Sequence, residues 1–116
     1  RAIPLPKDVN LAGDIFGGWM LSQMDLAGAS CASRFSRKRI VTVGIEAMSF
    51  HEPVFVGDEV SFYADIARVG RSSVMVKIDS YALRRESFDY VKVTEGLFTY
   101  VAIDAARRPV PIGTDG

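Results

Sequence analysis

The sequence predicts an α+β fold in which one long helix covers one face of an antiparallel sheet. Residues 13–36 carry apolar side chains at helical spacing, and no other stretch of similar length does so. Four later runs alternate between apolar and polar residues, which is typical of strands. Turn signals separate most of these runs, so the strands are expected to follow one another mostly as a meander. One helix and five strands, counting a short one at the N-terminus, make an α+β chain.

The expected helix has an apolar stripe with one carboxylate at its margin. At ~100° per residue the stripe contains Met20, Met24, Ala27, Cys31 and Phe35, and it is widened by Leu21, Gly28 and Ala32. Asp25 lies at the edge of this stripe. A carboxylate in that position loses part of its hydration and becomes a candidate acid or base. The alternative is an ordinary surface aspartate beside the stripe.

Five strands are expected to form the sheet. Residues 1–6 are limited to a short edge strand because their two prolines cannot donate backbone hydrogen bonds. Residues 39–50 form the next strand, and three longer runs follow, joined by a tight turn at 70–73 and a polar stretch at 84–89. In each of these four strands we expect the apolar residues to lie on one face. They are Val41, Val43, Ile45 and Ala47 in the first; Val60, Phe62, Ala64 and Ile66 in the second; Val74, Val76 and Ile78 in the third; and Val91, Val93, Leu97, Val101 and Ile103 in the last.

The expected sheet of five strands has only one helix to cover it, which indicates an oligomer. A single helix covers only one face of such a sheet, so the other face and the edges remain free for a partner. We therefore expect at least a homodimer.

Length and composition narrow the class of protein. The 116 residues suit a single domain spanning residues 1–116, with 105–116 as a C-terminal tail. Fourteen basic and fourteen acidic residues give a formal net charge of zero, which argues against a nucleic-acid-binding protein. One cysteine and one histidine predict neither a disulfide nor a metal site. We also expect no membrane span, no secretory signal and a cytoplasmic location.

Three motifs coincide along the chain. NLAGDIFGGW at residues 10–19 leads into SQMD at residues 22–25, Val41-Thr42 opens the next strand, and VGRSS occupies residues 69–73. Together they resemble the YciA-like bacterial acyl-CoA thioesterases of the hotdog superfamily, over residues 1–112. The resemblance implies a hotdog fold, dimers with a joined sheet and trimers of dimers. It also implies hydrolysis of acyl-CoA thioesters in fatty acid metabolism without a metal or cofactor, and it places the helix carboxylate at Asp25.

The residues around the helix can supply the chemistry of thioester hydrolysis. Asp25 can act as a base on water or attack directly, and the sequence does not separate these routes. Free backbone N–H groups at Gly17 and Gly18 are candidates for an oxyanion hole, although the two glycines could equally serve a tight turn. Asp14 is either the N-cap of the helix or a residue that faces Asp25 of a partner subunit.

The turn at residues 70–73 is the candidate site for the phosphates of coenzyme A. Gly70, Arg71, Ser72 and Ser73 offer backbone N–H groups, two hydroxyls and a guanidinium, while the alternative is an ordinary polar hairpin. His51 is not expected to form a catalytic triad, because no nucleophile-elbow pattern accompanies it. The rival functions are a non-catalytic acyl-CoA-binding domain and a hotdog hydratase or dehydratase.

Overall fold

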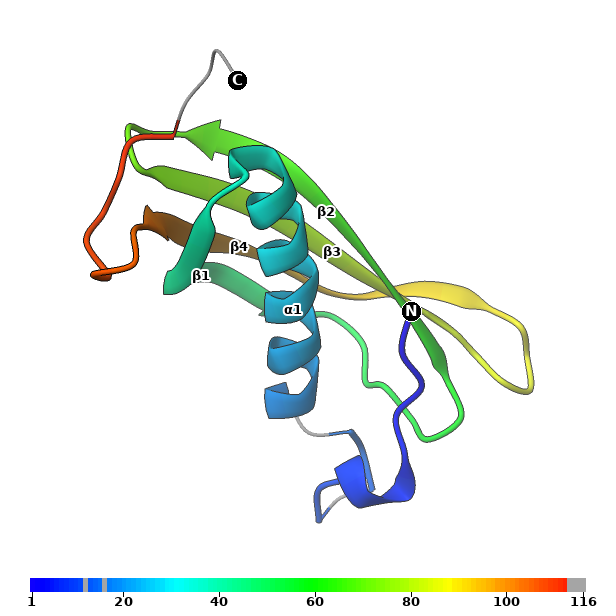
Figure 1. Ribbon diagram of the computed structural model, residues 1–116. Helices are drawn as coiled ribbons and strands as arrows, with labels where there is room; N and C mark the ends of the chain where they lie inside the picture. The colour runs from blue at the N-terminus through cyan, green and yellow to red at the C-terminus, as the bar shows by residue number, and fades with distance from the viewer. Residues whose placement is uncertain (12, 16, 113–116) are drawn as a thin grey trace.

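The computed structural model describes residues 1–11, 13–15 and 17–112, in which a helix crosses one face of an antiparallel sheet (Figure 1). The elements in chain order are η1 (Pro6–Asp8), α1 (Gly17–Ser36), β1 (Arg39–Phe50), β2 (Glu59–Val69), β3 (Ser73–Leu83) and β4 (Tyr90–Ile103). The strands lie in the order β1-β4-β3-β2, and every neighbouring pair is antiparallel. The last three strands form the expected meander, and β1 is added beside β4. This arrangement is the expected hotdog fold.

The helix is shorter than predicted and buries a narrower row of side chains. It begins at Gly17 rather than at residue 13, and its buried residues recur every fourth position: Met20, Met24, Gly28, Ala32 and Ser36. The predicted stripe is therefore correct for most of its length. Phe35 was expected on the stripe but is 47% exposed. Ser36 takes the buried position in the last turn, which turns Phe35 about 100° away from the sheet.

The described part of the chain forms four long strands rather than five. The N-terminal segment contributes a single antiparallel bridge between Ala2 and Val60 on β2. Pro4 and Pro6 have no N–H to continue that ladder, and Pro6 begins the short helix η1. The expected fifth strand is thus reduced to one pair.

The predicted face of β1 is wrong because the strand is irregular. Pairing with β4 shifts register between Thr42 and Gly44, and again between Glu46 and Ser49. The first shift leaves Val43 without a paired residue and the second falls beyond Ile45, so a single alternation from Val41 to Ala47 does not hold. Both are exposed, at 58% and 40%, while Ile40 and Met48 pack against the core.

A similar irregularity changes which residues of β4 face the helix. Ser80 pairs with Thr94, whereas the next residue of β3, Tyr81, pairs with Lys92. Val93 is the extra residue between them and is buried, as predicted. Beyond it the prediction fails for Leu97 and Val101, which are only half-buried, and holds again at Ile103, which is 5% exposed. The core contains Phe98, Tyr100 and Ala102 instead.

The core lies between α1 and the sheet and has two parts. One part joins Met24 and Ala32 of the helix to Val74, Val76 and Ile78 of β3, which are buried as predicted. The predicted residues Phe62, Ala64 and Ile66 of β2 line its margin. The other part lies toward the start of the helix and contains Met20, Val54 and Val60 among others.

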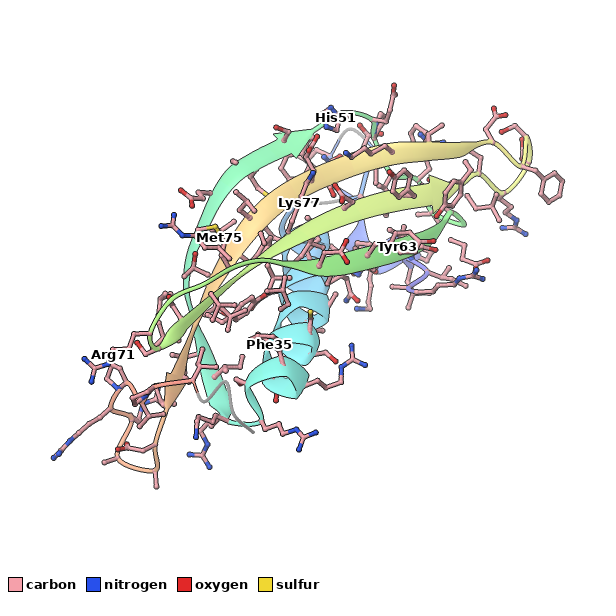
Figure 2. The ribbon with its side chains drawn as sticks, turned by 90° about the horizontal axis from the view of Figure 1, so that it is seen from above. Phe35, His51, Tyr63, Arg71, Met75 and Lys77 are labelled. Carbon is pink, nitrogen blue, oxygen red and sulfur yellow. The ribbon has the colours of Figure 1, made fainter. Side chains whose placement is uncertain are left out.

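None of the residues that the structure describes forms a helix over the opposite face of the sheet, which Figure 2 shows from above. Figure 2 labels Tyr63 and Met75 on the strands seen from this side, and the Tyr63 side chain is 50% exposed. β1 and β2 are the two outermost strands. Within the described residues, no helix combines the length and hydrophobicity needed to cross a membrane.

Candidate active site

Asp25 lies in the middle of α1 and is held by two hydroxyl groups from the sheet. Thr42 Oγ1 donates a hydrogen bond of 2.7 Å to Oδ1 of the carboxylate. The Tyr100 hydroxyl lies 3.1 Å from the same Oδ1 and 3.1 Å from the backbone carbonyl oxygen of Asp25. Asp25 is half-buried, as its place at the edge of the stripe predicted. The carboxylate is therefore oriented by two strands.

The sheet register explains why both hydroxyls reach the same carboxylate. Thr42 of β1 and Tyr100 of β4 are directly paired across the ladder, so their side chains share one face of the sheet. The Tyr100 side chain is fully buried beneath α1. Its burial, followed by the adjacent Asp25 carboxylate, raises the pKa of the Tyr100 hydroxyl well above its usual range. The hydroxyl therefore keeps its proton and remains a donor.

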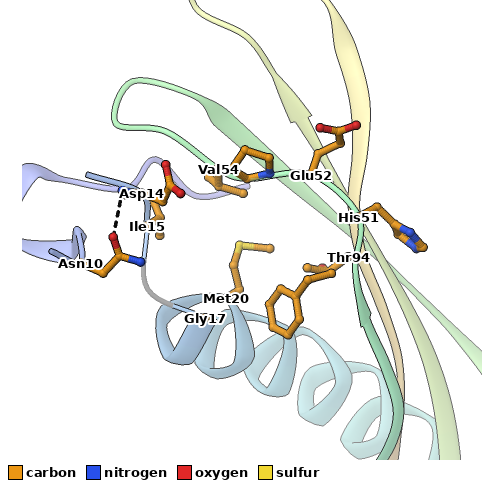
Figure 3. Close-up of a pocket in the computed structure, with 11 residues that line it drawn as sticks. Asn10, Asp14, Ile15, Gly17, Met20, His51, Glu52, Val54 and Thr94 are labelled. Carbon is orange, nitrogen blue, oxygen red and sulfur yellow. Dashed lines mark hydrogen bonds between the residues drawn. The ribbon is translucent and has the colours of Figure 1, made fainter. Parts of the chain in front are cut away.

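A second feature, a cavity, lies at the start of α1 (Figure 3). Its volume is about 330 Å³, and its walls come from the segment before the helix, the first turns of α1, the end of β1 and the chain after it. The residues that line it are Asn10, Asp14, Ile15, Gly17, Met20, Phe50, His51, Glu52, Pro53, Val54 and Thr94. We refer to it below as the helix-start cavity.

Asn10 and Asp14 hold the segment that precedes the helix. The Asp14 N–H donates to Oδ1 of Asn10 at 3.1 Å, and the Asn10 N–H donates to the Asp14 carbonyl at 2.6 Å. Because α1 begins at Gly17, Asp14 lies two residues before the N-cap position that it was a candidate to occupy. Asp14 instead forms part of the cavity wall together with Gly17.

Gly17 and Gly18 occupy the first turn of the helix, where backbone N–H groups have no partner within the helix. Both glycines are exposed. A methyl group added at Gly17 would make an ordinary contact of 3.5 Å with the Phe50 ring, and one added at Gly18 would meet nothing within 4 Å. Close packing within the chain therefore does not explain why either position is glycine.

The structure separates Asp25 from the helix-start cavity of its own chain. Asp25 follows Gly17 by two turns of helix, which corresponds to about 12 Å along the axis. Asp14 and Gly17 line the cavity, and Asp25 does not. The predicted catalytic residues thus form two groups within one chain.

His51 lies at the rim of the cavity, and its ring points away from Gly17 and Met20 (Figure 3). Its Nε2 atom is 2.7 Å from Oε2 of Glu95 on β4. Lys92 lies 3.4 Å from the same carboxylate. The hydrogen bond from His51 and then the charge of Lys92 lower the pKa of Glu95 below its usual range. His51 therefore belongs to an ion-pair cluster, with no serine or cysteine among the partners described for it.

The turn at residues 70–73 lies at the opposite end of the sheet from His51, as the position of Arg71 in Figure 2 shows. The Gly70 N–H donates to the Ser73 carbonyl, which closes the expected hairpin. The carbonyls of Arg71 and Ser72 accept hydrogen bonds from the N–H groups of Ile112 and Ala102. A hollow of about 320 Å³ lies between the turn and residues 109–111 of the tail. Arg71 is exposed and lines this hollow.

Three residues at these sites, Tyr100, Thr42 and Asn10, were not identified as functional from the sequence. Thr42 was quoted only as part of a motif, although its hydroxyl binds the Asp25 carboxylate. Tyr100 was missed because the extra residue in β4 reverses the expected face of the strand. Asn10 was quoted only as part of a motif, although it lines the cavity and holds the Asp14 segment. Among the described residues, no three His, Cys, Asp or Glu side chains are grouped to hold a metal ion.

Comparison with known proteins gives the family. The model of the Thioesterase superfamily matches residues 12–87, which is more than half of the chain. The chain belongs to the thioesterase superfamily.

Individual relatives agree with this assignment. The chain is 41% identical to the acyl-CoA thioester hydrolase YciA of Salmonella typhimurium over all of this chain and 90% of that protein. A solved hexameric thioesterase from Yersinia pestis is 41% identical with a TM-score of 0.93, covering 97% of this chain and 92% of that one. A hexameric hotdog fold thioesterase of Campylobacter jejuni is 40% identical with a TM-score of 0.94, covering 98% of this chain and 88% of that one.

Proposed function

We propose that this protein hydrolyses acyl-CoA thioesters to free coenzyme A and a carboxylic acid. The observation that carries the proposal is Asp25, a half-buried carboxylate oriented by Thr42 and Tyr100 in a thioesterase fold. The relatives named as acyl-CoA thioester hydrolases support the choice of substrate class.

Asp25 performs the chemistry by one of two routes. As a general base, its carboxylate takes a proton from water while the water oxygen bonds to the thioester carbonyl carbon, and the C–S bond then breaks with its electron pair leaving on sulfur. As a nucleophile, a carboxylate oxygen bonds to the carbonyl carbon and expels the thiolate, and water then hydrolyses the resulting anhydride. In both routes the thiolate is a good leaving group and takes up a proton from solvent.

Backbone N–H groups at Gly17 and Gly18 are proposed to stabilise the oxyanion that forms on the thioester oxygen. Free N–H groups and the positive end of the helix dipole both favour a negative charge there. Since Asp25 does not line the cavity of its own chain, we propose that each active site combines Asp25 of one subunit with Asp14, Gly17 and Gly18 of another.

A homodimer is the smallest assembly that provides such a site, and a trimer of dimers is the proposed full assembly. The exposed apolar side chains Val43 and Ile45 on the edge strand β1 favour a second copy at that edge. The hexameric states of the Yersinia and Campylobacter relatives support the larger assembly.

Coenzyme A is proposed to place its phosphates at Gly70, Arg71, Ser72 and Ser73. The exposed guanidinium of Arg71 suits a phosphate. The Gly70 N–H and the carbonyls of Arg71 and Ser72 are already used within the protein, so the side chains carry most of this role.

The decisive experiment measures release of free thiol from acyl-CoA substrates of different chain length. We expect continuous turnover, with free coenzyme A and carboxylic acid formed in equal amounts. Binding of acyl-CoA without turnover would instead identify a non-catalytic binding domain. Hydration of an enoyl-CoA without thiol release would identify a hydratase.

A further inference from the structure

The Asp25 carboxylate has two oxygen atoms, and the structure distinguishes them. Both side-chain hydrogen bonds that reach the carboxylate from the described residues end on Oδ1, one from Thr42 and one from Tyr100. We infer that Thr42 and Tyr100 are positioning residues that hold Oδ1 and leave Oδ2 as the oxygen that carries the reaction. This inference rests on the proposed function, since it assigns atoms within the same site.

The hydrogen bonds hold both the side chain and the backbone of Asp25. The Tyr100 hydroxyl lies 3.1 Å from both Oδ1 and the backbone carbonyl oxygen of Asp25, so one hydroxyl bridges the side chain and the helix. Thr42 binds Oδ1 from the neighbouring strand at 2.7 Å. A β-branched threonine on a strand has few side-chain conformations, so it is a rigid donor. Together the two donors restrict rotation of the carboxylate about its Cβ–Cγ bond.

Gly28 provides the space that the Tyr100 hydroxyl needs beneath α1. A Cβ atom at Gly28 would collide with the Tyr100 hydroxyl oxygen and would lie 2.7 Å from Cδ1 of Ile78. Glycine in a helix interior stabilises the helix less than alanine does, yet the buried row of α1 has a glycine at this position. The helix is therefore built to admit this hydroxyl three residues after Asp25.

Tyr100 acts only as a donor in this arrangement. Burial beneath the helix and the nearby carboxylate raise the pKa of its hydroxyl, so it does not exchange a proton with Asp25 during the reaction. Its contribution is to orientation, and misplacement of a reacting group by about 1 Å can slow catalysis about 10²-fold. The expected effect of losing it is thus on kcat and not on substrate affinity.

The test compares Thr42→Val, Tyr100→Phe and the double variant in the full-length oligomer. Each substitution removes one hydroxyl and keeps the shape of the side chain. We expect each single variant to lose roughly tenfold in kcat and the double variant roughly a hundredfold, with KM within about twofold of wild type. Thr42→Ser, which restores the hydroxyl, should recover most of the kcat lost in Thr42→Val.

Tyr81→Phe is the matched control, because it removes a tyrosine hydroxyl that makes no contact with Asp25; Tyr81 instead stacks on Tyr90. It should keep the wild-type kcat. Melting temperature and oligomer size show whether each variant is folded and assembled.

Results of three kinds would overturn the inference. The first is a double variant with kcat within twofold of wild type while Asp25→Asn is inactive, which leaves the proposed function intact. The second is a Thr42→Ser variant as slow as Thr42→Val, or a loss that lies in KM. The third is a wild-type protein that releases no thiol from any acyl-CoA, which removes the proposed function as well.

Discussion

The middle and the start of α1 differ in the side chains that surround them within one chain. Around Asp25, two hydroxyls from β1 and β4 meet the carboxylate, and a glycine in the helix makes room for one of them. Around Gly17, the chain forms an open cavity with exposed glycines and no part of Asp25 in its wall. The first region orients a reactive group, while the second offers N–H groups and space. The difference teaches that the candidate catalytic groups of one chain lie in two separate regions, which is the basis of the proposed site shared between subunits.

The largest effect is expected at Asp25. Asp25→Asn keeps the shape of the side chain but removes the basicity and most of the nucleophilicity of the carboxylate, so kcat should fall at least ~10². The folded state should remain, as judged by the melting temperature. A variant that retains more than a tenth of the wild-type kcat would show that the middle of α1 is not the reactive half.

The start of α1 can be tested by removing a single N–H group. Gly17→Pro deletes that donor at the first helical position, which is where proline is best tolerated. We expect kcat to fall by about 10² because one oxyanion donor is lost. Gly17→Ala is the control: it keeps the N–H, and its methyl group fits against Phe50. Equal kcat values for the two variants would remove Gly17 from the oxyanion hole.

The separation of the two halves predicts complementation between inactive subunits. When Asp14→Asn and Asp25→Asn are co-expressed, a mixed dimer carries both defects in one site and neither defect in the other. Random pairing makes about half of the dimers mixed, so roughly a quarter of the wild-type activity should return. Each variant expressed alone is the control, and mass spectrometry identifies the mixed dimers.

A site within one chain would instead leave every site with one defect, and no activity would return. If Asp14→Asn alone keeps full activity, Asp14 has no catalytic part, and the partner's contribution reduces to Gly17 and Gly18.

A smaller effect, confined to binding, is expected at the far end of the sheet. Arg71→Ala should raise KM for acyl-CoA roughly three- to tenfold with little change in kcat, because the phosphate is bound equally in the ground state and the transition state. The wild-type KM should also rise with ionic strength. Coenzyme A that binds Arg71→Ala as tightly as wild type would show that Arg71 is only a surface side chain of the hairpin.

The smallest effect concerns the ion pairs at the rim of the helix-start cavity. His51 and Lys92 hold the pKa of Glu95 below its ordinary value of 4.5. The unfolded chain therefore binds a proton at Glu95 more readily, so this contribution to stability is fully present above pH 4.5 and is lost as the pH falls through the lower pKa of the folded protein.

Glu95→Gln should thus have a slightly lower melting temperature than wild type near pH 7, and the difference should shrink below pH 4.5. Glu86→Gln, in the exposed loop between β3 and β4, is the control. A difference between wild type and Glu95→Gln that stays constant with pH would show that the ion pairs at Glu95 do not contribute to stability.

The sequence by itself determined the fold class and the position of Asp25 on the helix. Helical spacing identified α1 and placed Asp25 at the edge of its buried row, because a period of 3.6 residues is a property of the local backbone. Simple alternation likewise identified three buried residues of β3, Val74, Val76 and Ile78. The turn residues marked both hairpins. The motif from Asn10 to Asp25 indicated the family, which comparison confirmed.

Only the tertiary structure decided which strand residues meet the helix. One extra residue in a strand reverses every side chain beyond it, and nothing in the local pattern of β1 or β4 marks such a residue. This is why Tyr100 was not among the residues predicted to face the helix. Its pairing with Thr42 over Asp25 became visible only once the strands were in register. The separation of Asp25 from the start of the helix follows from the sequence positions alone, because it depends only on the rise per residue. The cavity beside Gly17 does not, because its walls come from segments up to residue 94 that only folding brings together.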